Sequence, residues 1–297
     1  MIFNQNGEGA EELRVVTSSY YANADFDKIA GIVEQVQDEI ARQIGTDVMA
    51  AIEQEYINGQ LTPLVKAAQR TIGYMSVLRY FRLNDISHET DGRKVKMDST
   101  NERRPFEWQL ERDDQMHLEE YYNAYDRLVM LLMDDSTFQQ STLYKRIQSL
   151  CITSAGVLEW VTGIEATPHL YLRMAPAIFE AQQYVEKRLG RPFTEIEDEA
   201  LRYLFQAATG NRAVALFVQK TEMKTLPSGA FRIAVSQNHG TTASSTTDQL
   251  HDFHVHMMSV SDNYIHDMQH RRDVLVGEEG EHLIVPNNDK ENKYFIM

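Results

Sequence analysis

The sequence lacks features that several classes of protein require. It has a single cysteine, Cys151, so no internal disulfide can form, and a disulfide-stabilised secreted scaffold is disfavoured. No apolar run approaches the roughly 20 residues that a membrane-crossing helix needs. The N-terminal segment has no basic region followed by an apolar core, so no signal peptide is expected. These absences favour a protein of a reducing cytoplasm with no membrane partner.

Motifs of catalysis and nucleotide binding are missing as well. The sequence contains no G-x-S-x-G nucleophile elbow, no Walker A motif and no G-x-G-x-x-G loop. It also contains no C-x-x-C or H-E-x-x-H, which are the usual zinc signatures. Cys151 lies in apolar sequence and is predicted to be a buried, inert thiol. We therefore expect a protein that is not an enzyme and that holds no cofactor.

Basic residues are scarce relative to acidic ones. The chain carries 29 Lys and Arg against 44 Asp and Glu, which gives a formal net charge of −15. Broad, non-specific wrapping of nucleic acid needs clustered cations, so the acidic balance argues against it. One local basic patch remains compatible with this composition.

What the sequence has instead is similarity between its two halves. Four segments of the first half match four of the second in the same order, at offsets of 145, 140, 137 and 140 residues. The pairs are Asp38–Gly45 with Gln183–Gly190, Leu64–Gln69 with Leu204–Thr209, Asp91–Lys96 with Ser228–Ile233, and Gln109-Leu110 with Gln249-Leu250. Chance similarity between helical stretches is the alternative. Four ordered matches at similar offsets favour a duplicated module.

Apolar residues spaced three and four apart predict a mainly α fold. We expect two tandem helical-bundle modules, each with a short β-hairpin and a long C-terminal helix. The first module covers residues 1–140 with a hairpin at about 83–98, and the second covers 141–276 with a hairpin at about 223–236. Residues 277–297 are predicted to form an extended C-terminal tail.

Several local features are predicted with this plan. A short extended piece is expected at Leu13–Thr17 in an otherwise irregular start of the chain. Pro176 is expected to kink a helix or to mark its first turn. A helix capped by Thr194 is expected to end at about Ala208, and another to follow over Asn211–Lys220 after a break. Gly277 is expected to end the last helix.

The only dense basic cluster lies on and just after the first predicted hairpin. It consists of Arg93, Lys94, Lys96, Arg103 and Arg104. One interpretation is contact with a phosphate backbone or with an acidic partner surface. The other is a solvated hairpin whose cations pair with nearby acids, namely Asp98, Glu102 and Glu107.

The predicted helix 248–276 is rich in histidine and aspartate. These residues are His251, Asp252, His254 and His256, followed by His266, Asp267 and His270. Histidines at such spacings can bind a metal, and His-Asp pairs are typical of HD-type phosphohydrolases. The two clusters are about 15 residues apart, roughly 22 Å along a helix, so one helix cannot bring both to one ion. A solvated polar face, or a pH-responsive subunit contact, is the alternative.

The end of the chain carries a small apolar cluster, Tyr294, Phe295, Ile296 and Met297, in otherwise polar sequence. Short extended motifs of this kind dock on a neighbouring surface or sheet edge. A frayed terminus is the alternative.

The order of these elements resembles the head–tail connector, or adaptor and head-completion ring, proteins of tailed phages. The resemblance is carried by the helix ending in Ile44-Gly45, the Leu64–Ala68 helix and the Gly92 hairpin, and by their counterparts around Gly190, Leu204–Ala208 and Gly229. Both the doubled length and the closing segment are similar to ring proteins of crAss-like Bacteroidetes phages. Single-module adaptors have about half this length, so contact surfaces do not transfer residue by residue.

The resemblance implies a structural subunit of a homo-oligomeric ring, commonly twelvefold. Such a ring docks on the portal protein, joins it to tail or other ring proteins, and surrounds a channel in which DNA lies close by. It would be located in the virion neck, at the head–tail junction, after assembly in the host cytoplasm. Two other functions remain open: a helical metal-dependent hydrolase using His251, His254, His266 and Asp267, and a helical protein-binding module.

Overall fold

The computed structural model describes residues 1–19, 25–84, 87–89, 92–94, 107–222 and 247–281, and these are mainly helical, as predicted. The chain divides into two compact units. The first comprises Met1–Ser149 with Thr167–Arg173, and the second comprises Leu150–Ala166 with Met174–Met297. The division after Ser149 replaces the expected boundary at residue 140.

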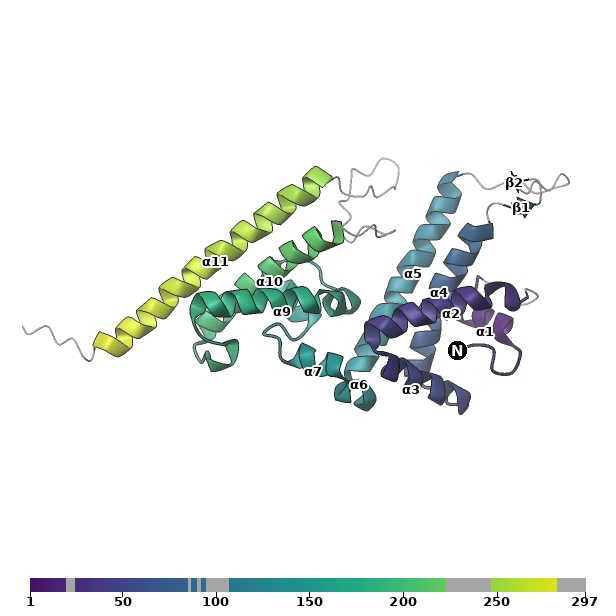
Figure 1. Ribbon diagram of the computed structural model, residues 1–297, viewed down its shortest axis with the longest axis horizontal. Helices are drawn as coiled ribbons and strands as arrows, with labels where there is room; N and C mark the ends of the chain where they lie inside the picture. The colour runs from purple at the N-terminus through teal and green to yellow at the C-terminus, as the bar shows by residue number, and fades with distance from the viewer. Residues whose placement is uncertain (20–24, 85–86, 90–91, 95–106, 223–246, 282–297) are drawn as a thin grey trace, which may run out of the picture. The chain divides into compact units, whose positions relative to one another are not determined.

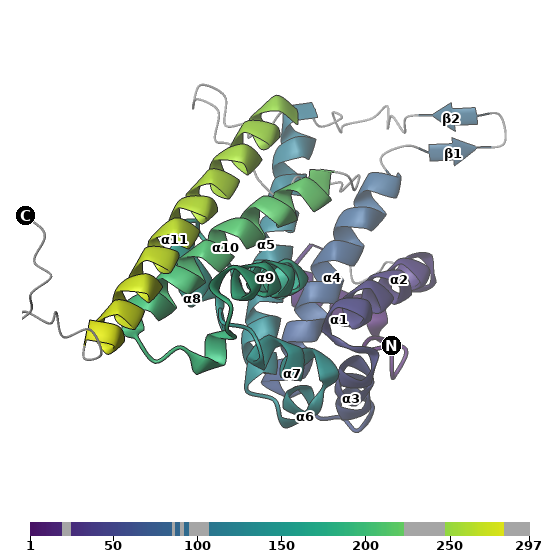
Figure 2. The ribbon, with the colours of Figure 1, turned by 60° about the vertical axis from the view of Figure 1, so that its left-hand side comes forward.

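The first unit is a bundle built around a pair of long helices (Figure 1). Its helices are α1 (Gly9–Thr17), α2 (Asp27–Ile44), α3 (Thr46–Ile57), α4 (Pro63–Asn84), α5 (Glu107–Met133), α6 (Ser136–Gln140) and α7 (Thr142–Gln148). Helices α4 and α5 lie side by side in both ribbon views (Figures 1 and 2). Helix α2 packs on α4 through an apolar stripe of Ile29, Val33, Val36, Ile40 and Ile44, all of which are buried.

Two short strands lie between α4 and α5. Strand β1 (Ser87–Glu89) pairs with β2 (Gly92–Lys94) in antiparallel register, with Ser87 opposite Lys94 and Glu89 opposite Gly92. The remainder of the predicted hairpin from residue 95 onward lies outside the described residues.

The prediction of an extended piece at Leu13–Thr17 was wrong, because this segment belongs to α1. Leu13 and Thr17 are one helical turn apart and are both buried, and the Thr17 hydroxyl donates to the Leu13 carbonyl. The Val15-Val16-Thr17 run has a strand preference, but burial of one helical face against α4 overrides it. Ser18 then ends the helix in the left-handed region, at φ 56°.

The second unit has fewer described elements than the first. These are α8 (Ala155–Thr162), α9 (Pro168–Leu189), the short 3₁₀ helix η1 (Phe193–Glu195), α10 (Glu199–Glu222) and α11 (Thr247–Glu281). The first residues of α9 belong with the first unit. Helices α10 and α11 lie side by side (Figures 1 and 2). The second predicted hairpin, at about 223–236, lies outside the described residues.

Two helix boundaries differ from the sequence-based expectation, and the position of Pro176 excludes one of its two predicted alternatives. Helix α10 is continuous from Glu199 and has no break after Ala208, because the Asn211 side chain is buried and donates to the Ala207 and Val161 carbonyls. Pro176 lies inside α9 rather than in its first turn. Helix α11 continues past Gly277 to Glu281, so the predicted tail does not begin at residue 277.

Two glutamines hold one extended residue of the first unit between α2 and α4. The Ile2 N–H donates to Gln37 Oε1 at 3.0 Å, and Gln69 Nε2 donates to the Ile2 carbonyl at 2.9 Å. Ile2 and both glutamines are buried, so these bonds satisfy backbone groups that water does not reach. We call this arrangement the glutamine clamp.

The second unit contains a glutamine clamp of the same form. The Cys151 N–H donates to Gln182 Oε1 of α9 at 2.8 Å, and Gln206 Nε2 of α10 donates to the Cys151 carbonyl at 2.7 Å. Gln37 and Gln182 are 145 residues apart, and Gln69 and Gln206 are 137 apart. The hydrogen bonds therefore match Gln69 with Gln206, whereas the sequence alignment at offset 140 matches it with Thr209.

Further contacts recur at the same offsets. In α8 the Thr162 hydroxyl donates to the Leu158 carbonyl, and Gly163 ends the helix in the left-handed region, as Thr17 and Ser18 do in α1. The buried stripe of α2 recurs in α9 at an offset of 145, as Met174, Ile178, Ala181, Val185 and Leu189. Buried positions of α5 recur in α11 at an offset of 140: His117, Tyr121, Tyr125 and Leu128 correspond to Met257, Ser261, Ile265 and Met268.

Gly210 lets α10 approach α8 closely, and this contact can be tested. A Cβ at Gly210 would lie 2.8 Å from Val161 Cγ2 and 3.0 Å from Thr162 Cγ2. We expect Gly210→Ala to be destabilising, because overpacking costs about 1–3 kcal/mol and outweighs the gain of about 1 kcal/mol in helix propensity. Unfolding in urea measures the difference.

Gly31→Ala is the matched control, since Gly31 is also inside a helix but has open space where its Cβ would lie. It should raise the free energy of unfolding by about 0.5–1 kcal/mol. Equal stability of the two variants would show that α8 and α10 are not in close contact at Gly210.

Candidate functional site

The structure leaves most of the predicted contact residues outside what it describes. Arg93 and Lys94 lie on β2, but their side chains are not described, and Lys96, Arg103 and Arg104 lie outside the described residues. The same holds for the apolar cluster 294–297 at the end of the chain. These two candidate sites stay predictions.

The histidine-rich segment forms part of α11, and its members are dispersed. His251, His256, His266 and His270 are exposed, whereas His254 is half-buried with its Nδ1 2.9 Å from the Ala215 carbonyl of α10. The structure therefore does not bring together the residues proposed for a hydrolase. Among the described residues, no group of three or more His, Cys, Asp or Glu side chains has the geometry to hold a metal ion.

Cys151 is buried, as predicted. Burial raises the pKa of its thiol to about 12, so the reactive thiolate does not form near neutral pH. Its backbone is held by the glutamine clamp, so this residue has a packing role.

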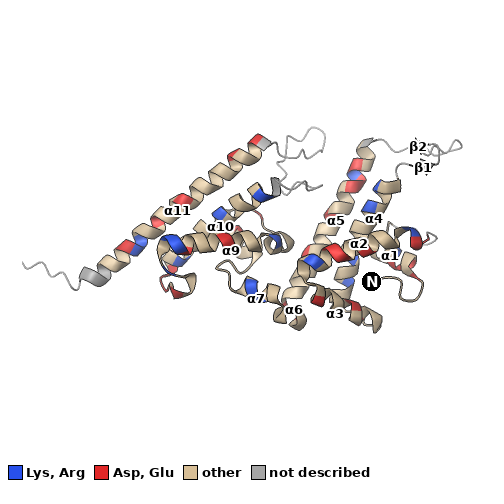
Figure 3. Ribbon diagram, in the orientation of Figure 1, with Lys and Arg blue, Asp and Glu red and all other residues tan. Residues whose placement is uncertain are grey.

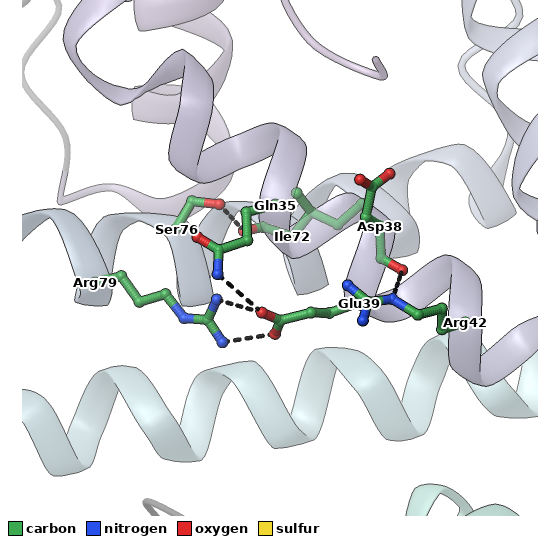
Figure 4. Close-up of polar contacts among 7 residues, drawn as sticks. All are labelled: Gln35, Asp38, Glu39, Arg42, Ile72, Ser76 and Arg79. Atoms are coloured by element: carbon green, nitrogen blue, oxygen red, sulfur yellow. Dashed lines mark hydrogen bonds and ion pairs between the residues drawn. The ribbon is translucent and has the colours of Figure 1, made fainter.

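An ion pair with an additional hydrogen bond joins α2 to α4 in the first unit (Figure 4). Arg79 donates from Nη1 to Glu39 Oε1 at 2.9 Å and from Nη2 to Glu39 Oε2 at 2.7 Å, which is a bidentate ion pair. Gln35 Nε2 also donates to Glu39 Oε1, at 3.4 Å. Both charged side chains are half-buried. The two helices are therefore joined by a fixed pair of opposite charges.

This pairing makes Glu39 unsuited to proton transfer near neutral pH. The hydrogen bond from Arg79 lowers the pKa of the Glu39 carboxyl, and this effect outweighs the rise that burial causes. The same bond raises the pKa of Arg79. Both groups remain charged, and the pair acts as a brace between α2 and α4.

Two tyrosines of α5 lie near the brace and are equally inert. Tyr125 is buried and donates its hydroxyl to Gln43 Oε1 at 2.8 Å. Burial raises the pKa of Tyr121 and of Tyr125 far above neutrality. Both side chains belong to the core of the first unit.

A second polar site fixes the start of α9 within the first unit. His169 Nδ1 lies 2.8 Å from Asp126 Oδ1, and the same oxygen accepts the His169 backbone N–H at 2.8 Å. The imidazole stacks on Tyr122 and Tyr125, with ring centroids 4.8 Å and 5.6 Å away. Asp126 thus caps the N-terminus of α9 from α5.

The sequence did not predict this site. A signal was present, since Thr167 before Pro168 is a typical start of a helix. Nothing in the local sequence connects that helix start to Asp126, which is more than 40 residues earlier. A histidine paired with an aspartate is also found in catalytic triads, but here the Asp126 carboxylate caps the N-terminus of α9.

The described helices show no candidate for a membrane crossing, because none of them is both long and apolar enough. Comparison of the chain with models of protein families, with curated proteins and with solved structures found no match. No family is therefore assigned.

The Glu39–Arg79 brace should make stability depend on pH. We expect Glu39→Gln to lower the free energy of unfolding by about 0.5–1 kcal/mol near pH 7, since the pair is partly exposed. The folded-state pKa of Glu39 is lowered, so its contribution is present above the unfolded pKa of about 4.3 and is lost as the pH falls through the folded-state value. Urea unfolding measures the free energy of unfolding of both proteins, and the difference between wild type and variant should be smaller near pH 3 than near pH 7.

Asp38→Asn is the control, because Asp38 is an exposed neighbour on α2 whose backbone carbonyl, not its carboxylate, accepts from Arg42 (Figure 4). Its effect should not change with pH in the same way. A Glu39→Gln effect that is the same at both pH values would rule out the brace as a charge interaction.

Proposed function

We propose that the chain is a non-enzymatic structural subunit of a head–tail connector ring of a tailed phage. In this proposal the chain consists of two copies of one helical module, each with a short hairpin and a long C-terminal helix. The ring docks on the portal protein and joins it to tail components around the DNA channel, in the neck of the virion.

The observation that carries the proposal is the recurrence of the glutamine clamp. Two glutamines on two different helices bind the N–H and the carbonyl of a single residue in each unit. A buried polar arrangement of this kind is far more specific than an apolar pattern, because each donor needs one acceptor at one place. Its recurrence with the same caps and the same buried stripes supports duplication of a whole module.

Exposed apolar side chains support assembly with other chains. Val15 on α1 is 68% exposed and Trp160 on α8 is 79% exposed, and the two positions are 145 residues apart, at the offset of their helices. Single exposed apolar residues are common, but tryptophan is enriched at interfaces, and here the exposure recurs at equivalent positions. Repeated surfaces of this kind suit closed assemblies with many equivalent contacts.

The proposal predicts a large native mass for the protein. Purified protein, alone and mixed with the portal protein encoded near it, should form a closed high-order ring in at least one of the two samples. Native mass spectrometry or light scattering gives the result. A persistent monomer or dimer in both samples would contradict the ring and favour a helical protein-binding module.

Two substitutions locate the contacts within such a ring. Trp160→Ser should lower the ring fraction while the helical content stays unchanged. Met130→Ser is its control, because Met130 is also an exposed apolar residue, at 52%, but its equivalent position in α11 is His270. Equal loss of the ring in both variants would exclude a specific contact at Trp160.

The basic cluster is expected to contact the portal or the DNA. We predict that the triple charge reversal Arg93→Glu, Lys94→Glu, Lys96→Glu abolishes incorporation of the ring into particles or portal complexes. The control reverses three exposed cations of the same unit, Lys28, Lys66 and Arg70, and so changes the net charge equally. Normal incorporation of the first variant, or the same defect in both, would remove the cluster from the interface.

A further inference from the structure

Half of the histidines of this chain lie on one helix. Five of the ten fall within α11, which spans 35 residues. Helix α11 packs on α10 through four buried residues, Met257, Ser261, Ile265 and Met268. The opposite side of α11 is therefore exposed, and His266 and His270 lie on it.

His266 and His270 have the spacing of a chelating pair. They are four residues apart on a regular helix, so their Cβ atoms lie roughly 5–6 Å apart on one face. Two histidines at this spacing bind one zinc ion in the H-E-x-x-H helices of metalloproteases. His251 and His256 are also exposed but are five residues apart, so they lie on different faces and do not form such a pair.

Three exposed carboxylates lie near the pair on the same helix. Asp262 lies one turn before His266, Asp267 follows it, and Asp273 lies just beyond His270; all three are exposed. Acidic residues mark α11 at several places along its length (Figure 3).

The cations nearest to the pair are each in contact with a carboxylate, and for Arg212 and Arg272 this is one of the three near the pair, which leaves Asp267 as the carboxylate with no ion pair to a described residue. Arg271 donates to Asp198 at 2.8 Å and 3.2 Å, and Arg272 donates to Asp273 at 2.6 Å. From α10, Arg212 contacts Asp262 only at 3.4 Å, and its guanidinium lies over the Tyr184 ring, 3.5 Å from the centroid.

We propose that His266 and His270 form a two-histidine surface site for a divalent transition-metal ion. Imidazole nitrogens bind Zn²⁺, Ni²⁺ and Cu²⁺ well, and of these three ions Cu²⁺ should bind the site most tightly. Water fills the remaining coordination positions, since the described residues provide no third ligand. The site does not depend on the ring function and differs from the hydrolase hypothesis, which needs His251 and His254 as well.

Calorimetric titration of the purified full chain, without a histidine tag, tests the site with Zn²⁺ and Ni²⁺ as probes. His266→Gln with His270→Gln should remove the site, and the loss should exceed the roughly 10- to 100-fold cost of losing an outer-sphere partner. His251→Gln with His256→Gln is the control and should keep the affinity of the wild type. All four side chains are exposed, so both variants should keep the wild-type fold, which circular dichroism checks.

A spacing test separates chelation from simple histidine content. In a His270→Gln background, Asp262→His restores a pair four residues apart and should restore binding. Asp267→His in the same background places the histidine next to His266, on another face, and should not restore it.

Two outcomes would overturn the proposal. If the variant lacking His266 and His270 binds as tightly as the wild type, the metal is bound elsewhere. If the control variant loses as much affinity, or if both rescue variants bind equally, the ions associate with surface histidines regardless of spacing.

Discussion

The buried backbone of one non-helical residue in each unit is the constraint on which the rest of the packing depends. Ile2 and Cys151 lie between two helices, where water does not reach their N–H and carbonyl groups. An unpaired buried polar group costs about 1–3 kcal/mol, so each segment needs a donor and an acceptor at fixed places. The glutamine clamp provides both, one glutamine from each helix. The spacing and rotation of α2 against α4, and of α9 against α10, are thereby fixed.

Once these two helices are set, the neighbouring contacts follow from shape. The short helix that precedes them packs where a glycine leaves room, at Gly73 for α1 and at Gly210 for α8. The long helices α5 and α11 then cover the exposed side of α4 and α10. In the first unit the Glu39–Arg79 brace adds an ion pair between α2 and α4. In α9 the position equivalent to Glu39 is Tyr184, whose ring lies under the Arg212 guanidinium. The two units thus have similar patterns of buried core residues, whereas the polar contacts outside each core differ.

The sequence predicted the elements whose signal is local. The apolar periodicity predicted a mainly α fold and placed the last helix at 248–276, close to the observed α11 (Thr247–Glu281), and the apolar neighbours of Cys151 indicated its burial. The sequence did not predict the glutamine clamp. A buried helical glutamine cannot be told from a solvated one by its position in the apolar pattern, and the residue it binds lies at least 31 residues away in the chain. For the same reason α1 was taken as extended and α10 as broken: burial of Thr17 and of Asn211 depends on helices remote in sequence. The histidines of α11 were recognised, but only the structure shows which of them face outward.

Helices α5 and α11 differ in the side chains of their outer faces. At the offset of 140 residues, Asp126 corresponds to His266 and Met130 corresponds to His270. On α5, Asp126 binds His169 and caps the start of α9, so this face of the helix receives another part of the chain. The same face of α11 carries an exposed histidine pair instead. Asp126 is half-buried and Met130 is 52% exposed, whereas both histidines of α11 are exposed, and the change from carboxylate to imidazole at the first position alters which ligand it accepts. This difference connects the proposed duplication with the proposed metal site, because similar patterns of buried positions carry outer faces of different chemistry.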